Sequence, residues 1–185
     1  MDAVTAAFGA VPREEFLPRR ERARASYNGP IQIGHGQSNS QPRTVEAMLR
    51  LLDVQPGQRV LDVGSGSGWT TALLAHLVGP TGEVIGVEIQ PQLLEFGREN
   101  LARFDFPWAS IRPAERGVLG LPDEGPFDRI LVSAEPQTLP TALLDQLGDP
   151  GRMVIPVSGT MLLVQQEGEA LDVTPHGYYR FVPLR

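Results

Sequence analysis

The sequence contains no cysteine and no apolar run of 18 residues. The lack of cysteine excludes disulfide bonds and thiolate metal ligands, although it does not by itself decide the redox compartment. A membrane-spanning helix needs about 20 consecutive apolar residues, so none is expected. The beginning of the chain also lacks the basic segment followed by an apolar one that is typical of a secretory signal. We therefore expect a cytoplasmic protein without a membrane partner.

Runs of basic residues are also missing. The formal net charge is -6, and the only basic cluster, residues 19–24, is interrupted by Glu21. Nucleic-acid-binding domains usually carry a basic patch or stripe, so no nucleic-acid partner is expected. The three histidines are far apart in the sequence and no cysteine accompanies them. This pattern predicts no metal site.

What remains is an ordinary globular composition, with 41% hydrophobic and 21% charged residues in a chain of 185. This length suits one domain with a full core. The 17 prolines and 20 glycines are spread along the chain and mark no linker. We expect a single domain over residues 1–185, and a monomer.

The most informative stretch is residues 60–69, which reads Val-Leu-Asp-Val-Gly-Ser-Gly-Ser-Gly-Trp. Its apolar half predicts a parallel strand buried on both faces. Its alternating glycines predict a tight turn on which a ligand can lie directly. In open α/β sheets, ligands bind beyond the carboxyl ends of the strands. The stretch therefore predicts a cofactor site that includes Gly64, Ser65, Gly66 and Gly68.

Around this stretch, predicted strands and helices alternate. Helices are predicted at residues 12–18, 42–52, 69–78 and 91–104, and strands at residues 59–63, 84–88, 109–112 and 127–133. Their alternation predicts an α/β fold, a Rossmann-like, doubly wound and mostly parallel sheet with helices on both faces. Residues 27–41 show too little apolar periodicity for a strand or helix and are predicted to form a functional loop.

From Gly151 the pattern changes to short strands, predicted at residues 153–156, 161–166, 171–174 and 178–182. They predict an antiparallel extension of the sheet. The domain is thus expected to have three parts. Residues 1–42 form an N-terminal helix and active-site loop, residues 43–150 a cofactor-binding α/β core, and residues 151–185 a C-terminal β extension.

Two acidic residues indicate which cofactor binds. Glu88 ends the second core strand, where it can accept hydrogen bonds from both hydroxyls of an adenosine ribose. Dinucleotide sites use the spacing Gly-x-Gly-x-x-Gly, whereas the turn here reads Gly-x-Gly-x-Gly and follows Asp62. A carboxylate there would repel a diphosphate and suits the cationic methionine end of S-adenosylmethionine, which we predict as the cofactor. The alternative is that the glycines only form a turn and Asp62 only caps a helix.

Five segments resemble those of the protein-L-isoaspartate O-methyltransferase family and occur in the family order. They are residues 11–18, 33–42, 61–72, 86–89 and 180–184. The resemblance spans nearly the whole chain. It implies a class I methyltransferase for protein repair that methylates the α-carboxylate of L-isoaspartyl residues in damaged proteins. The ester then closes to a succinimide, which can reopen as normal aspartate. Isoaspartyl-containing proteins or peptides are therefore the expected substrates.

The resemblance also implies roles for individual residues. Ser40 matches the serine usually assigned as active, and Ser38 matches a neighbouring threonine that we place in the cofactor site. Asp62 and the three glycines match the methionine-binding turn, and Glu88 matches the ribose acid. A carboxylate is already a nucleophile, so placement and partial desolvation suffice, and Ser40 can orient it by a hydrogen bond. Ser40 could instead be an N-cap of the helix that Pro42 begins.

Three positions depart from the family pattern. Asn39 stands where the family has an apolar residue. Residues 115–117 read Glu-Arg-Gly in place of a Gly-Asp-Gly whose aspartate contacts the adenine amine. Arg116 cannot accept that hydrogen bond, so Glu115 or the backbone of Gly117 would have to. Glu135 adds an acid at a strand end that faces the acceptor. These departures leave two alternatives, a methyltransferase of the same fold with another acceptor, or a non-catalytic relative that binds the cofactor or a protein.

Overall fold

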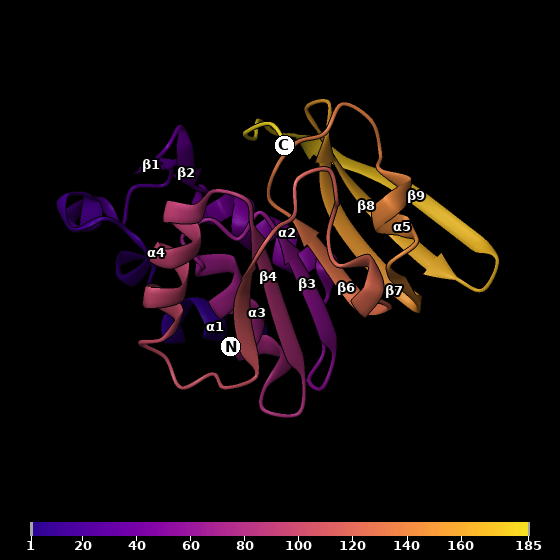
Figure 1. The fold of residues 1–185 in the computed structure, drawn as a ribbon, viewed down its shortest axis with the longest axis horizontal. Coiled ribbons are helices and arrows are strands. Elements are labelled where there is room, and N and C mark those ends of the chain that lie inside the picture. The colour runs from indigo at the N-terminus through magenta and orange to yellow at the C-terminus, as the bar shows by residue number, and fades with distance from the viewer. Residues whose placement is uncertain (1, 185) are drawn as a thin grey trace.

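The computed structural model describes residues 2–184, so Met1 and Arg185, the ends of the expected domain, lie outside the described residues. The described chain forms a seven-stranded sheet and a separate two-stranded hairpin, β1–β2. The hairpin and the edge strand β9 of the large sheet lie toward opposite ends of the molecule's long axis (Figure 1). The strands are β1 (Ile31–Gly34), β2 (Gln37–Asn39), β3 (Arg59–Val63), β4 (Glu83–Glu88), β5 (Ala109–Pro113), β6 (Phe127–Val132), β7 (Leu147–Val157), β8 (Thr160–Glu167) and β9 (Ala170–Tyr178).

The order of strands in the large sheet is β5-β4-β3-β6-β7-β8-β9. Parallel pairing joins β5 through β7, and antiparallel pairing adds β8 and β9. The predicted fold class, mostly parallel with an antiparallel C-terminal extension, is confirmed. From β3 the chain turns to β4 on one side and later returns to β6 on the other. The carboxyl end of β3 is therefore the switch point at which ligands bind in such sheets.

Helices cover the two faces of the sheet unevenly. One face packs against α2 (Pro42–Leu52), α3 (Trp69–Val78) and α4 (Pro91–Leu101), and α1 (Ala3–Ala10) packs on α2 and α3. The other is covered by loops, a 3-10 turn (Pro122–Glu124) and the single-turn helix α5 (Thr141–Leu144). Among residues 2–184, no helix combines the length and hydropathy of a membrane span.

The strand β3 illustrates why the fold places its side chains as it does. Successive side chains of a strand point to opposite faces of the sheet. Val60 belongs to the core under the four long helices, whereas Leu61 and Val63 belong to the core on the opposite face. Asp62 therefore points toward the helices, where its hydrogen-bond partners are on α3. The buried acid lies on the helix-covered side of the sheet.

Residues 31–39 correct one prediction. They were predicted to contain no strand, but β1 and β2 pair in an antiparallel hairpin whose turn holds Gly34, His35 and Gly36 at positive φ. Ile31 and Ile33 alternate with polar residues and pack with Leu17 and Leu93. The two strands are only four and three residues long, too short for their apolar period to stand out in the sequence.

The C-terminal segment corrects a second prediction. Residues 171–174 belong to the single strand β9, and the strand predicted at residues 178–182 does not form. After Tyr178 the chain leaves the sheet instead. The backbone N–H of Glu135 donates to the carbonyl of Val182 (2.8 Å), and the N–H of Leu184 donates to the carbonyl of Glu135 (3.0 Å). These bonds bring the tail to the carboxyl end of β6.

Two α-helices were missed and two helices are shorter than predicted, since the one predicted at residues 91–104 ends at Leu101. The helix α1 reads Ala-Val-Thr-Ala-Ala-Phe-Gly-Ala, and its small residues give it no clear apolar stripe. The helix α5 has only four residues. The helix predicted at residues 12–18 is the 3-10 helix Arg13–Phe16. The predicted helices at 42–52 and 69–78 are confirmed.

Candidate active site

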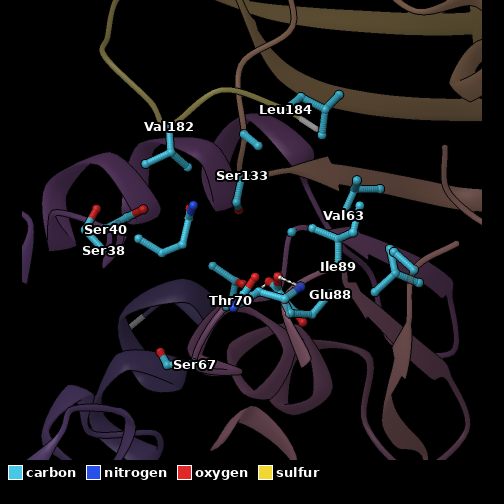
Figure 2. Close-up of a pocket in the computed structure, with 18 of the residues that line it drawn as sticks. Ser38, Ser40, Val63, Ser67, Thr70, Glu88, Ile89, Ser133, Val182 and Leu184 are labelled. Atoms are coloured by element: carbon cyan, nitrogen blue, oxygen red, sulfur yellow. Dashed lines mark hydrogen bonds between the residues drawn. The ribbon is translucent and has the colours of Figure 1, made fainter. Parts of the chain in front are cut away.

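A cleft opens at the carboxyl ends of β3, β4 and β6. It encloses about 1030 Å³, including the part open to solvent, which is enough for a cofactor-sized ligand. Its walls come from the turn after β3, the end of β4, the hairpin β1–β2, the loop after β6 and the tail. Figure 2 shows Ser38 and Ser40 on one side of the cleft, Val182 and Leu184 above it, and Thr70 and Glu88 at its floor.

The turn after β3 forms the floor of the cleft. Gly64, Ser65 and Gly66 line it as predicted. Both glycines have positive φ, 81° and 53°, a backbone conformation that other residues adopt only at a cost. The Ser65 hydroxyl is buried without a hydrogen-bond partner among the described residues. The turn thus offers exposed backbone and one unpaired polar atom to a ligand.

Gly68 has a packing role that the sequence did not predict. It does not line the cleft, and its φ is 85°. A Cβ added there would lie 2.9 Å from the carbonyl oxygen of Gly97 and 3.0 Å from Ile111 Cδ1. The absence of a side chain therefore lets the start of α3 pack against α4. The contact with the cofactor remains a prediction at this residue.

Glu88 lines the cleft next to the glycine turn. Its side chain is 7% exposed. One carboxylate oxygen accepts a hydrogen bond from the N–H of Gly66 and the other from the N–H of Gln90, both at 2.8 Å. A carboxylate can accept about four hydrogen bonds, so both oxygens keep acceptor capacity. The turn therefore orients this acid before any ligand arrives.

Asp62 lies behind the wall of the cleft, since it is not among the lining residues. Its Oδ2 accepts hydrogen bonds from the hydroxyls of Thr70 and Thr71, both at 2.7 Å. Its Oδ1 is buried and has no partner among the described residues. The pKa of Asp62 is raised to about 6, mainly by burial and also by the charge of Glu88, although the hydrogen bonds from Thr71 and Thr70 oppose the rise. Thr70 lines the cleft and links this acid to the wall.

Ser38 and Ser40 both line the cleft and are half-buried. The carbonyl of Ser40 accepts a hydrogen bond from Arg13 Nη2 at 2.9 Å. The N-cap position of α2 is occupied by Gln41, and no side chain caps this helix. The capping alternative for Ser40 is therefore wrong, and its hydroxyl remains available to a ligand.

Of the positions that depart from the family pattern, Asn39 lines the cleft, whereas Arg116 and Glu135 do not. Arg116 and Gly117 are exposed and do not line it, whereas Glu115 does. Arg116 therefore does not fill the space expected for adenine, and the predicted contact of Gly117 is not part of the lining. Glu135 contributes its backbone to the tail, and its side chain also lies outside the lining.

Sequence reasoning missed two parts of the site. The tail residues Val182, Pro183 and Leu184 line the cleft but were predicted to end a strand and follow it. Thr70, which bonds Asp62, was not singled out; its position one residue into the helix after the glycine turn is the available signal. Ser133 also lines the cleft, and it belongs to the strand end that was predicted to face the acceptor.

The chemistry of the lining suits S-adenosylmethionine. Glu88 lies at the floor of the cleft, and Asp62, behind its wall, is a second carboxylate with an unpartnered oxygen. Apolar side chains, including Val63 and Leu184, line other parts of the cleft. A ligand with a cationic end, sugar hydroxyls and an aromatic base matches this set. Within residues 2–184, no three His, Cys, Asp or Glu side chains converge as metal ligands.

Comparisons with known proteins agree with this chemistry. Residues 1–185 match the sequence model of the family described as Protein-L-isoaspartate(D-aspartate) O-methyltransferase (PCMT). A protein-L-isoaspartate O-methyltransferase of Methanocella arvoryzae is 42% identical over 177 residues, covering 94% of this chain and 94% of the relative. One from Myxococcus xanthus is 42% identical over 189 residues, covering 98% of this chain and 87% of the relative.

A solved structure is similar over the whole chain. It is described as a putative protein-L-isoaspartate O-methyltransferase from Plasmodium falciparum in complex with S-adenosyl-L-homocysteine. The similarity has a TM-score of 0.83 at 27% sequence identity and covers 100% of this chain and 91% of that one. The relative thus combines the same fold with a bound product form of the predicted cofactor.

Proposed function

Since the chain belongs to the protein-L-isoaspartate O-methyltransferase family, we propose that its cleft holds the cofactor against Asp62 and Glu88 and presents an isoaspartyl carboxylate to Ser40. The activity is S-adenosylmethionine-dependent methylation of L-isoaspartyl residues in damaged proteins. One observation carries the assignment of residues. The hairpin β1–β2 together with Ser40, which follows it (residues 31–40, the serine hairpin), and the glycine turn after β3 belong to the walls of the same cleft (Figure 2).

Three acids are proposed to hold the cofactor. S-adenosylmethionine, when bound, supplies an electrophilic methyl group on a positively charged sulfur. Glu88 would accept hydrogen bonds from the ribose hydroxyls with the acceptor capacity that Gly66 and Gln90 leave free. Asp62 would provide a countercharge and an unpartnered oxygen for the ammonium group. Glu115 lines the cleft and can accept a hydrogen bond from the adenine amine.

The remaining proposed site residues contribute backbone or hydroxyl groups. Gly64 and Gly66 would let the cofactor lie against the main chain, and Ser38 and Ser65 would offer their hydroxyls to it. Gly68 and Gly117 lie outside the lining of the cleft. Their contacts with the cofactor stay proposals, and Gly68 also serves the packing of the turn.

The acceptor is proposed to bind between the hairpin and the tail. An isoaspartyl carboxylate carries no proton at neutral pH, so its oxygen can form the new ester bond without a general base. The Ser40 hydroxyl would donate a hydrogen bond to the second carboxylate oxygen and fix its direction. Val182 and Leu184 would exclude water from this part of the cleft, which leaves the nucleophilic oxygen less solvated.

The direct test is transfer of a labelled methyl group from S-adenosylmethionine to an isoaspartyl peptide. The expected product is a methyl ester that releases labelled methanol at alkaline pH. A peptide of the same sequence with normal aspartate is the control and should remain unlabelled. Failure to label any of several isoaspartyl peptides would refute the proposed acceptor, and labelling of another carboxylate would favour a different one.

The role of Ser40 has a sharper test. Ser40→Ala should lower kcat by roughly 10- to 100-fold, the value of about one hydrogen bond to a charged group, and should leave the Kd for S-adenosylhomocysteine nearly unchanged. Ser40→Thr keeps a hydroxyl and should retain most of the activity. An equal loss in turnover and cofactor affinity after Ser40→Ala would contradict the assignment.

A monomeric state, a cytoplasmic location and the single domain over residues 1–185 also remain proposals. The continuous seven-stranded sheet supports the single domain, because strands of the expected core, residues 43–150, and of the expected C-terminal extension, residues 151–185, pair with each other in it. Light scattering after size-exclusion chromatography tests the monomer. A mass twice that of the chain would contradict it.

A further inference from the structure

Arg13 is a buried cation that forms no ion pair with an acid among residues 2–184. It is 6% exposed and lies in the 3-10 helix before the hairpin. Burial lowers the pKa of Arg13 to about 10, and the charge of Arg24 adds to this effect. The side chain therefore still carries its charge at neutral pH. A buried charge is costly unless hydrogen bonds replace its hydration.

Backbone carbonyls and one amide oxygen replace that hydration. Arg13 Nε donates to Asn39 Oδ1 at 2.7 Å, and Nη1 donates to the carbonyls of Tyr27 at 2.7 Å and Ala25 at 3.3 Å. Nη2 donates to the carbonyls of Gly29 at 2.8 Å, Ser40 at 2.9 Å and Asn39 at 3.2 Å. One guanidinium thus ties the segment before the hairpin to the end of β2.

Asn39 continues these contacts toward the cofactor turn. It is 4% exposed, and its Nδ2 donates to Ser67 Oγ at 3.1 Å. Ser67 lies in the glycine turn, and its carbonyl accepts a hydrogen bond from Asn100 Nδ2 of α4 at 3.0 Å. A continuous chain of buried hydrogen bonds therefore joins Arg13, the serine hairpin and the glycine turn.

We propose that Arg13 and Asn39 are positioning residues of the methyl transfer. They hold the serine hairpin in a fixed position relative to the glycine turn. The inference rests on the proposed function, because it takes Ser40 as the group that meets the acceptor. Neither residue is assigned a contact with the reacting atoms. Arg13 acts on Ser40 through the backbone, because it binds the carbonyl of Ser40 and leaves the hydroxyl free.

The residue types match this role. Arginine presents five N–H donors in a planar fork, and here they serve carbonyls from separate turns. Lysine has three donors on a flexible stem and cannot reproduce this pattern. Asparagine both accepts from Arg13 and donates to Ser67. Aspartate keeps the acceptor for Arg13 and can take a hydrogen bond from the Ser67 hydroxyl, whereas leucine has the same branching and forms neither bond.

Asn39→Leu and Asn39→Asp form a matched pair for the test. Three quantities are measured: kcat on an isoaspartyl peptide, the Kd for S-adenosylhomocysteine, and hydrogen exchange of amides in residues 27–41. Asn39→Leu should lower kcat at least about tenfold, the equivalent of one lost hydrogen bond to a charged group, with the Kd changed less than about threefold. Exchange in residues 27–41 should become faster while exchange in α3 stays unchanged. Asn39→Asp should recover most of the wild-type kcat.

A wild-type kcat in Asn39→Leu would overturn the inference. So would equal losses in the leucine and aspartate variants, or a lower kcat without faster exchange. Arg13→Lys should change kcat and exchange in the same direction, and the pair at Asn39 decides the question if that variant does not fold. An inactive wild type or a fully active Ser40→Ala would overturn the proposed function instead. Hydrogen exchange measures how firmly the serine hairpin is held, whether or not the protein is active on isoaspartyl peptides.

Discussion

Replacing Asp62 with asparagine should remove a loss of stability that the wild-type protein suffers as the pH rises. Asp62 is fully buried, its Oδ1 has no partner among the described residues, and its Oδ2 accepts bonds from Thr70 and Thr71. Burial raises the pKa of this carboxyl from 3.8 to about 6. The free protein therefore holds the proton on Asp62 more tightly when folded than when unfolded.

The sign and size of the effect follow from this difference. Between pH 3.8 and about 6 the folded state binds more protons than the unfolded state, so the free energy of unfolding decreases as the pH rises. The stabilising contribution is complete below the unfolded pKa and is lost as the pH passes through the folded one. The shift, 6 − 3.8 = 2.2, corresponds to about 3 kcal/mol.

The asparagine at this position cannot titrate. Its amide N–H2 would occupy the place of the unpartnered Oδ1, at a cost of about 1–3 kcal/mol. That cost does not depend on pH and cancels when one variant is compared at two pH values. The quantity to measure is the unfolding free energy of Asp62→Asn minus that of the wild type. It should increase by about 2.4 kcal/mol between pH 4 and pH 7, because roughly a fifth of the full effect is already lost at pH 4.

Urea unfolding at pH 4, 5, 6 and 7 gives this quantity directly. Asp172→Asn is the matched control, because Asp172 is an exposed carboxylate on β9. Its difference from the wild type should stay within about 0.5 kcal/mol across the range. If the difference for Asp62→Asn is equally flat, burial of an ionisable carboxyl behind the cleft cannot be the source of the pH dependence, and the reasoning fails.

Three other results are expected. Calorimetry should show that the affinity of the wild type for S-adenosylhomocysteine rises from pH 5 to pH 7, since the bound ammonium group favours ionised Asp62. Asp62→Asn should lose this pH dependence. An unchanged pH dependence in the variant would show that Asp62 is not part of the ammonium site. Glu88→Gln places an N–H2 against one of two backbone N–H groups and should weaken the same ligand about tenfold or more, whereas unchanged affinity would contradict the ribose contact. Gly68→Ala should lower the free energy of urea unfolding by about 2–4 kcal/mol, because the alanine would have positive φ and would contact Gly97. The control Gly117→Ala, with positive φ but open space around it, should lower it by about 1–2 kcal/mol. Equal losses in the two variants would contradict the packing role.

The sequence by itself determined the core of the fold and the nature of the cofactor. The apolar runs of β3 and β4, the glycine spacing and the two acids at Asp62 and Glu88 are local features. Parallel strands joined by helices bring their carboxyl ends to one edge. Local patterns were therefore enough to place the glycine turn beside Glu88, because the fold class brings the carboxyl ends of neighbouring parallel strands together.

Only the tertiary structure decided how the acceptor side is built. The Arg13–Asn39 bond joins residues 26 apart, and the Asn39–Ser67 bond joins residues 28 apart. The tail reaches the cleft through backbone bonds between Glu135 and residues 182 and 184. Backbone and amide hydrogen bonds of this kind leave no periodic trace in a sequence, because almost any residue can supply a carbonyl and the partner is chosen by packing.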